Sequence, residues 1–205
     1  MAPTAPPAFP PEPLTLSGRH VVLEPLSISH LGDLLEAGVD PDIWRWMPQA
    51  YFTDQALARQ WIEDALSEQT SGRSLPFAII DRPSGQAVGS TRLFDFRLEH
   101  KALEIGWTWI GASYQRTAIN TECKRLLLGL AFDELLALRV QFKTDSRNTR
   151  SRAAIERVGA QFEGVLRNHV LLPSGDHRHS AFFSILDHEW PLVRQQLDDL
   201  LKQAR

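Results

Sequence analysis

The sequence has almost nothing with which to cross-link itself. Cys123 is the single cysteine among 205 residues, so no internal disulfide can form, as is usual in a reducing compartment. A chain of this length can bury enough apolar surface to fold without a disulfide or a structural metal. We therefore expect one α/β domain, located in the cytoplasm.

Long apolar runs and a strong charge of either sign are also missing. No stretch is long and apolar enough to cross a bilayer, and the start, Met1 to Pro7, lacks the cationic and apolar segments of a signal peptide. The net charge of −3 provides no general field for nucleic acid or an anionic membrane. We expect neither as a partner, so any anion site must come from local basic residues and backbone N–H groups.

Several common site motifs are absent as well. The sequence contains no phosphate-binding P-loop, no dinucleotide-binding glycine motif and no G-x-S-x-G nucleophile elbow. His177 and His179 could share one face of a strand, but no further ligands cluster near them, so we expect no metal. Cys123 is a lone cysteine in a helical segment and is expected to be packed rather than reactive.

The pattern of apolar residues predicts a mixed sheet with flanking helices. Residues 1–13 are rich in Pro and Ala and are predicted to form a flexible lead-in to a single domain over 14–205. Ser29 and Thr53 are the expected caps of the first two amphipathic helices. The expected strands are 19–26, 76–81, 87–96, 103–110, 139–144 and one on each side of the turn 173–176. The remaining expected helices are a piece around 44–46, then 121–136, 149–158 and a last one from 189. This order predicts a largely antiparallel sheet with one parallel pair, joined by the helix at 121–136.

Two stretches have the chemistry of an anion site. Residues 115–120 connect a strand to a helix start, where free backbone N–H groups and the helix dipole favour a pyrophosphate. Arg116, Lys124 and Arg125 add positive charge there. Taken alone, the loop is more simply an ordinary connection, and Asn148, after the next strand, is more simply a helix cap. The case depends on finding both stretches in this order.

Five segments in one order resemble the GNAT superfamily of N-acetyltransferases. Within it, the sequence is most similar to the group of RimJ/RimL ribosomal-protein N-terminal acetyltransferases. Tyr114–Cys123 resembles that group's loop Y-[WQ]-G-x-G-x-A-T-E-A. The other four are Leu103–Trp107 (E-I-G-[YW]), Asn148 to Ser151 with Gly159-Ala160 (N-x-x-S and G-[FA]), Glu163–Arg167 (E-G-x-x-R), and Met47-Pro48 with the following acceptor-side helix. The similarity extends from residue 15 to 193.

The resemblance implies a GNAT fold, α/β (α+β), with a central parallel pair of splayed strands. It also implies transfer of acetyl from acetyl-CoA to a primary amine, either a protein N-terminus or a small-molecule amine, by direct attack. Acetyl-CoA is then the co-substrate, CoA and an amine acceptor are the partners, and a homodimer is left open. The alternative is a degenerate GNAT-fold protein that binds CoA without turnover. The implied CoA-binding residues are Gln115, Arg116, Thr117, Ala118, Ile119, Asn120, Asn148 and Ser151.

The same resemblance assigns candidate roles in catalysis. Glu104 is the candidate base, acting through a water, although a solvated strand carboxylate is the simpler explanation. Ser151 is the candidate acid for the leaving thiolate, unless it only caps its helix together with Asn148. Trp44, Trp46 and Trp107 are candidates for the acceptor mouth, although core packing explains such aromatic residues about as well.

Three of the departures from the group's pattern bear on the expected chemistry. Ala118 and Asn120 stand where small residues let the pyrophosphate approach the backbone. We expect Ala118 to be tolerated if its φ is negative, and Asn120 to cap the helix or bind a phosphate. Ile155 stands where many members carry a tyrosine acid, so that acid is not available.

Overall fold

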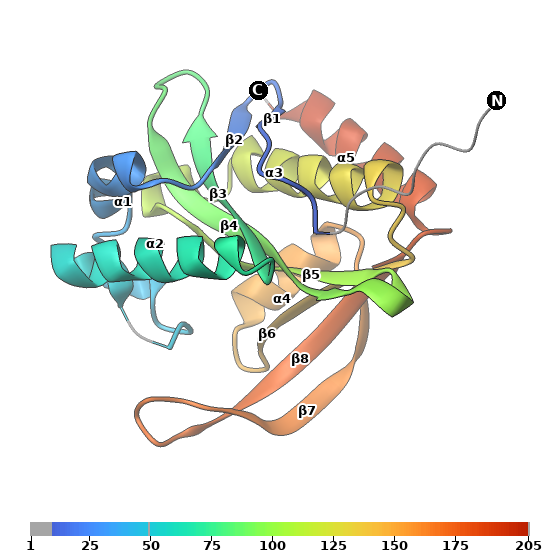
Figure 1. The fold of residues 1–205 in the computed structure, drawn as a ribbon. Helices are drawn as coiled ribbons and strands as arrows, with labels where there is room; N and C mark the ends of the chain where they lie inside the picture. Colours follow the sequence, from blue (N-terminus) through green and yellow to red (C-terminus); the bar gives the residue numbers. More distant parts are fainter. Residues whose placement is uncertain (1–9, 49, 205) are drawn as a thin grey trace.

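The computed structural model describes residues 10–48 and 50–204, which build an eight-stranded sheet covered by helices on both faces (Figure 1). The strands lie in the order β1-β2-β3-β4-β5-β6-β8-β7. Within the described chain, β5 and β6 form the parallel pair, and the other neighbours are antiparallel. The predicted mixed sheet with one parallel pair is therefore confirmed. The strands are β1 (Leu16–Ser17), β2 (Val21–Pro25), β3 (Ser74–Asp81), β4 (Ala87–Arg97), β5 (Ala102–Ile110), β6 (Arg139–Asp145), β7 (Gln161–Leu171) and β8 (His177–Leu186).

Helices pack on the two faces of the sheet and close two apolar cores. Residues of α1 (Leu31–Ala37) and α2 (Gln55–Thr70) share one buried cluster. Residues of α3 (Ala118–Gly129) and α5 (Trp190–Gln203) share the other. The connection between β6 and β7 contains α4 (Thr149–Arg157).

Strand β3 shows why the sheet is covered on both sides. Its Leu75 and Phe77 belong to the cluster under α3 and α5, whereas its Ala78 and Ile80 belong to the cluster under α1 and α2. Successive side chains of a strand point to opposite faces, so a strand that is apolar at each position from Leu75 to Ile80 needs a cover on both faces.

Two predicted helix caps are wrong by one or two residues. Asp54, not Thr53, caps α2, because its carboxylate accepts two N–H groups of the first turn. Ser29 lies inside a short 3₁₀ turn that precedes α1, and Ser27 stands before that turn. At α2 the neighbouring carboxylate of Asp54 reached the free N–H groups better than the hydroxyl that the pattern favoured, whereas no described side chain caps α1.

Helix α3 begins one turn earlier than the predicted residue 121. Thr117 caps it, with its hydroxyl accepting a hydrogen bond from the Ile119 N–H at 3.3 Å. Asn120 consequently lies within the first turn and is not the cap. The helix continues as a π-helical turn over Leu130–Glu134.

The start of the chain is only partly covered by the structure. Residues 1–9 of the predicted lead-in lie outside the described residues, and residues 10–13 form no helix or strand. Across the described residues, no helix has the length and apolar character needed to cross a membrane.

Candidate active site

The site is organised by the point at which β5 and β6 part. They pair from Ala102 with Arg139 to Glu104 with Gln141, and the pairing then ends although both strands continue. Beyond Glu104 the two strands diverge and open a gap in the middle of the sheet. The expected splay of the parallel pair is present, and Glu104 stands at its apex.

A bulge in β5 accompanies the divergence. Arg92 pairs with Gly106 and Ser90 pairs with Trp109, so two residues of β5 face one residue of β4. Trp107, one of the two, has a φ of +52°, which is unusual for a bulky side chain. A bulge of this kind bends its strand and redirects a side chain, and here it accompanies the exposure of Trp107 to the cleft described below.

Glu104 is almost fully buried, with 1% of its surface exposed. Its Oε2 accepts hydrogen bonds from Gln141 Nε2 at 2.9 Å and Lys143 Nζ at 3.0 Å. Burial raises the pKa of Glu104, and the opposing charge and hydrogen bond of Lys143 and Gln141 only partly offset this. The carboxylate is therefore not the solvated strand carboxylate of the simpler explanation, and its Oε1 has no hydrogen-bond partner among the described residues.

The predicted CoA-binding stretches come together at the wide end of the gap. The carboxyl ends of β5 and β6 lie at the same edge because the strands are parallel, so the loops that lead into α3 and α4 meet there. Gln115 links them: its Nε2 donates to the Ile110 carbonyl at 2.9 Å, and its Oε1 accepts from Arg150 at 3.0 Å. Two helix N-termini thus meet at one opening, with the guanidinium of Arg150 bound between the loops, as an anion requires.

Asn148 and Ser151 form a cap with one free hydroxyl. The Asn148 Oδ1 accepts a hydrogen bond from the Ser151 N–H at 3.0 Å, so Asn148 does cap α4. The Ser151 hydroxyl, in contrast, makes no hydrogen bond to any described residue. Capping therefore explains Asn148 but not the hydroxyl of Ser151.

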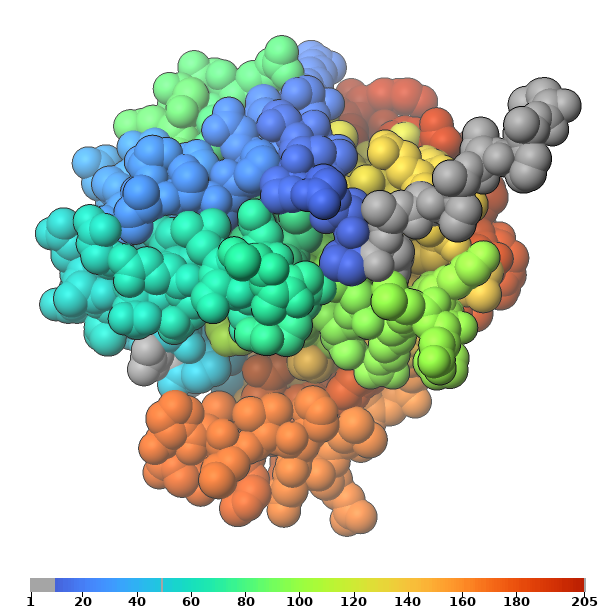
Figure 2. Space-filling view, in the orientation of Figure 1, coloured from blue at the N-terminus to red at the C-terminus, as the bar shows by residue number. Residues whose placement is uncertain are grey.

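A cleft of about 920 Å³ lies beside the residues that hold Glu104. Its wall is made by the end of α2, β4 to β6, and the β7–β8 hairpin, which stands apart from α2 in the space-filling view (Figure 2). Trp107, Gln141 and Lys143 line it, so it reaches the neighbours of Glu104. The polar and aromatic lining also includes Glu68, Arg73, Phe94, Asp95, Arg97, His169 and Phe182.

The three candidate tryptophans are not brought together. Trp107 lines the cleft. Trp44 is 3% exposed and packs against Phe52 and Trp109 at ring-centroid distances of 5.3 and 5.0 Å, as core packing predicted. Trp46 is half-buried and contacts Arg147 in the loop before α4, 5.3 Å from ring centroid to guanidinium carbon.

Sequence reasoning missed Arg92, which is 3% exposed behind the cleft. Its guanidinium lies between the rings of Trp61 and Trp107, at 4.5 and 4.8 Å, and donates to Glu68 at 3.0 Å. Burial lowers the pKa of Arg92, with Glu68 acting in the opposite direction. An arginine in the middle of the predicted strand 87–96 was the available signal. In the described residues there is no group of histidine, cysteine and carboxylate side chains that could hold a metal.

Comparison with known proteins decides the family. A model of the acetyltransferase (GNAT) domain matches residues 20–161. The chain belongs to the GNAT acetyltransferase family.

Individual relatives agree with this assignment. A GCN5-related N-acetyltransferase structure from Brucella melitensis is 32% identical, with a TM-score of 0.87 over 93% of this chain and 86% of that one. The chain is also 32% identical to YdaF of Bacillus subtilis, provisionally named a ribosomal N-acetyltransferase, over 52% of this chain and 57% of that protein. RimJ of Mycobacterium smegmatis, solved with CoA-disulfide, shares the fold, with 21% identity, a TM-score of 0.79, and coverage of 92% of this chain and 95% of its own. This chain is thus an acetyltransferase similar to the RimJ/RimL group.

The departures of this GNAT acetyltransferase from its group's loop now have a structural basis. Ala118 is the first residue of α3 and is absent from the positive-φ residues, so the expected condition for tolerating its methyl group is met. Arg116 stands where the group has a glycine, and its φ is +63°. The loop therefore keeps the left-handed backbone conformation that glycine adopts freely. This conformation is less favourable for arginine, because arginine has a Cβ atom. Ile155 is half-buried on α4 and packs against the core, where it offers no acid.

Proposed function

We propose that the protein transfers the acetyl group of acetyl-CoA to a primary amine, in particular the N-terminus of a protein. The observation that carries the proposal is the opening between β5 and β6 with Glu104 at its apex, with the predicted CoA-binding stretches after the two strands and a cleft lined by Gln141 and Lys143, which bind Glu104. A cofactor on one side and an acceptor on the other would meet at this carboxylate.

The residues present fit the phosphates of CoA. The N–H groups of Ala118 and Asn120, in the first turn of α3, donate to no described side chain, whereas the Ile119 N–H donates to Thr117. These N–H groups, with Arg116 and Arg150 nearby, would hold the pyrophosphate. Acetyl-CoA would supply the thioester carbonyl that the amine attacks.

Glu104 has the environment of a base for this reaction. An amine enters as an ammonium ion and must lose one proton before its nitrogen lone pair can attack the carbonyl carbon. A carboxylate whose pKa is raised by burial is a better proton acceptor than an ordinary one, and Oε1 is the atom left free to receive the proton through a water. Lys143 and Gln141 fix the other oxygen and so orient the carboxylate.

The free hydroxyl of Ser151 fits the end of the reaction. When the carbon–sulfur bond breaks, the electron pair stays on sulfur, and the thiolate must gain a proton or a hydrogen bond. The Ser151 hydroxyl has no other described partner, and it lies on the first turn of α4, at the CoA end of the opening. We assign it the role of hydrogen-bond donor to the sulfur.

Binding and turnover test the proposal separately. Calorimetry should show that CoA binds more tightly than pantetheine, which lacks the phosphates, and equal affinities would contradict the phosphate site. Release of free thiol from acetyl-CoA should follow the addition of N-terminal peptides. CoA binding without thiol release with any amine would instead favour the degenerate CoA-binding protein, an alternative that Ala118 and Asn120 in the loop support.

A further inference from the structure

The carboxylates of the cleft are all engaged by cations. Asp95 accepts a hydrogen bond from Arg97 at 2.7 Å. Glu68 accepts one from Arg92 at 3.0 Å, and behind them Glu104 accepts one from Lys143. An incoming ammonium group therefore finds no unpaired carboxylate among the described residues of the cleft.

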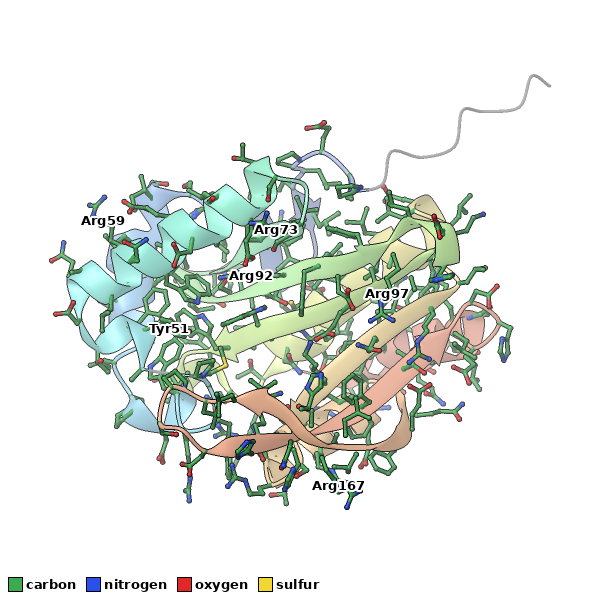
Figure 3. The ribbon with its side chains drawn as sticks, turned by 60° about the horizontal axis from the view of Figure 1, so that its bottom comes forward. Tyr51, Arg59, Arg73, Arg92, Arg97 and Arg167 are labelled. Atoms are coloured by element: carbon green, nitrogen blue, oxygen red, sulfur yellow. The ribbon has the colours of Figure 1, made fainter. Side chains whose placement is uncertain are left out.

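Arg73 is the exception among the cations. It follows the end of α2 and lines the cleft (Figure 3). Its side chain makes no hydrogen bond or ion pair with any described residue, unlike Arg97 and Lys143. A guanidinium left unpaired beside a cleft is suited to bind a carboxylate in a two-pronged geometry.

His169 does not add a second unpaired charge to the cleft. It lines the same cleft, and burial lowers its pKa, with the positive charges of Lys143 and Arg178 acting in the same direction. Its Nδ1 is 3.0 Å from the Ser180 hydroxyl. At neutral pH the ring is therefore mainly uncharged, and the unpaired charge of the cleft is the positive one of Arg73.

The sheet register gives the backbone separation between the neighbour of Arg73 and the base. Ser74, next to Arg73, pairs with Phe94, and Phe94 pairs with Glu104. These backbone positions are two strand spacings apart, or about 10 Å. Consecutive Cα atoms of a peptide are about 3.8 Å apart, so a side chain within the first three residues of a peptide matches a separation of this size.

We propose that the acceptor is a peptide N-terminus with an acidic side chain within its first three residues, and that Arg73 binds that carboxylate while the amine lies near Glu104. This inference rests on the proposed function and adds its specificity. Polycationic acceptors, such as polyamines and aminoglycosides, are disfavoured because they would meet the unpaired charge of Arg73 without a carboxylate to balance it.

Matched peptides test the inference. Peptides that differ only by Asp, Asn or Lys at the second or third position are compared as acceptors, by kcat/KM from thiol release. The wild-type protein should prefer the Asp peptides. Arg73→Gln should lower kcat/KM for them by about ten- to a hundredfold, the range for losing a hydrogen bond to a charged group, and should change the Asn peptides by less than about twofold. Arg73→Glu should reverse the preference toward Lys.

Arg59→Gln is the matched control. Arg59 lies near the opposite end of α2 from Arg73 (Figure 3), with its side chain half-exposed and 3.8 Å from Glu63. It is expected to leave the preference unchanged. Equal kcat/KM for Asp and Asn peptides in the wild type, or an equal loss for both in Arg73→Gln, would overturn the inference.

A binding measurement separates this inference from the proposed function. The affinities of the same peptides for the protein saturated with CoA are measured by calorimetry. Absence of thiol release with every peptide would contradict the proposed function, whereas tighter binding of Asp peptides, lost in Arg73→Gln, would still support the acidic acceptor. Equal or undetectable binding of Asp and Asn peptides, without turnover, would overturn the inference too.

Discussion

Replacing Glu104 with glutamine removes the charge of the proposed base while keeping its shape. The amide oxygen can still accept hydrogen bonds from Gln141 and Lys143, so packing at the apex of the strand opening is expected to persist. The ability to take a proton is lost. We expect kcat to fall by about a hundredfold, within the usual range for general-base catalysis, which is about 2.7 kcal/mol of activation free energy.

The pH dependence has a definite sign. Burial raises the pKa of Glu104, so the base becomes active only as pH rises through that raised value, and the wild-type kcat should increase with pH on its acid side. In Glu104→Gln this limb should disappear. Assays of thiol release at saturating acetyl-CoA and acceptor, over a range of pH, measure both effects.

Glu104→Gln should affect the free energy of unfolding differently from the activity. Between the ordinary glutamate pKa and its raised folded value, the folded protein binds more protons than the unfolded chain, so wild-type stability falls as pH rises through that interval. Glu104→Gln lacks this penalty and should unfold, near neutral pH, at a free energy within about 1 kcal/mol of wild type, since the net value of one altered hydrogen bond is of that size.

Glu163→Gln is the control variant for Glu104→Gln. Glu163→Gln removes another paired carboxylate, one that binds Arg139 and Ser184 away from the cleft, and should leave kcat unchanged. If Glu104→Gln keeps the wild-type kcat and the same acid limb, Glu104 is not the base. If it loses activity only together with folding, as seen by its melting temperature, the catalytic assignment also fails.

Three further predictions concern residues on the helices and turns around the site. Asn148→Ala should lower the unfolding free energy by about 0.5–2 kcal/mol, because it removes the cap of α4. Ser151→Ala should lower kcat while the melting temperature stays close to that of the wild type. If both variants lose stability and keep their kinetics, the pair only caps the helix. Glu122→Ala should destabilise the protein by about 3 kcal/mol or more in urea unfolding. The reason is that this buried carboxylate accepts hydrogen bonds from three backbone N–H groups, those of residues 19–21 at the start of β2. A change below about 1 kcal/mol would contradict that role. Gly159→Ala should lower the melting temperature, because φ is +103° and a Cβ would lie 2.9 Å from Val193; an unchanged melting temperature would show that the turn after α4 adapts.

Local pattern was enough for most of the secondary structure and for the parallel pair. Alternation and three- to four-residue spacing depend on which face a side chain presents, which is a property of the chain near that residue. It also predicts an anion site at the loop 115–120, because a helix N-terminus attracts negative charge wherever it lies. Helix starts were less reliable: Thr117 and Asp54 cap α3 and α2, one or a few residues from the predicted positions, because neighbouring polar side chains compete for the same N–H groups.

The chemical identity of the site depended on contacts between distant segments. Glu104 is raised in pKa by burial and fixed by Lys143, 39 residues away, and neither effect is visible in the local sequence. Trp44 and Trp107 are the same residue type in similar surroundings of sequence, yet packing places one in the core and the other at the cleft. Nothing in the sequence distinguishes Arg73 from the other arginines. It is distinctive only in the folded chain, where each carboxylate near it is paired with another cation. The sequence by itself determined most of the helices and strands and the edge of the sheet that carries the predicted CoA-binding loops. Burial and charge pairing arise between elements, so they were decided by the tertiary structure.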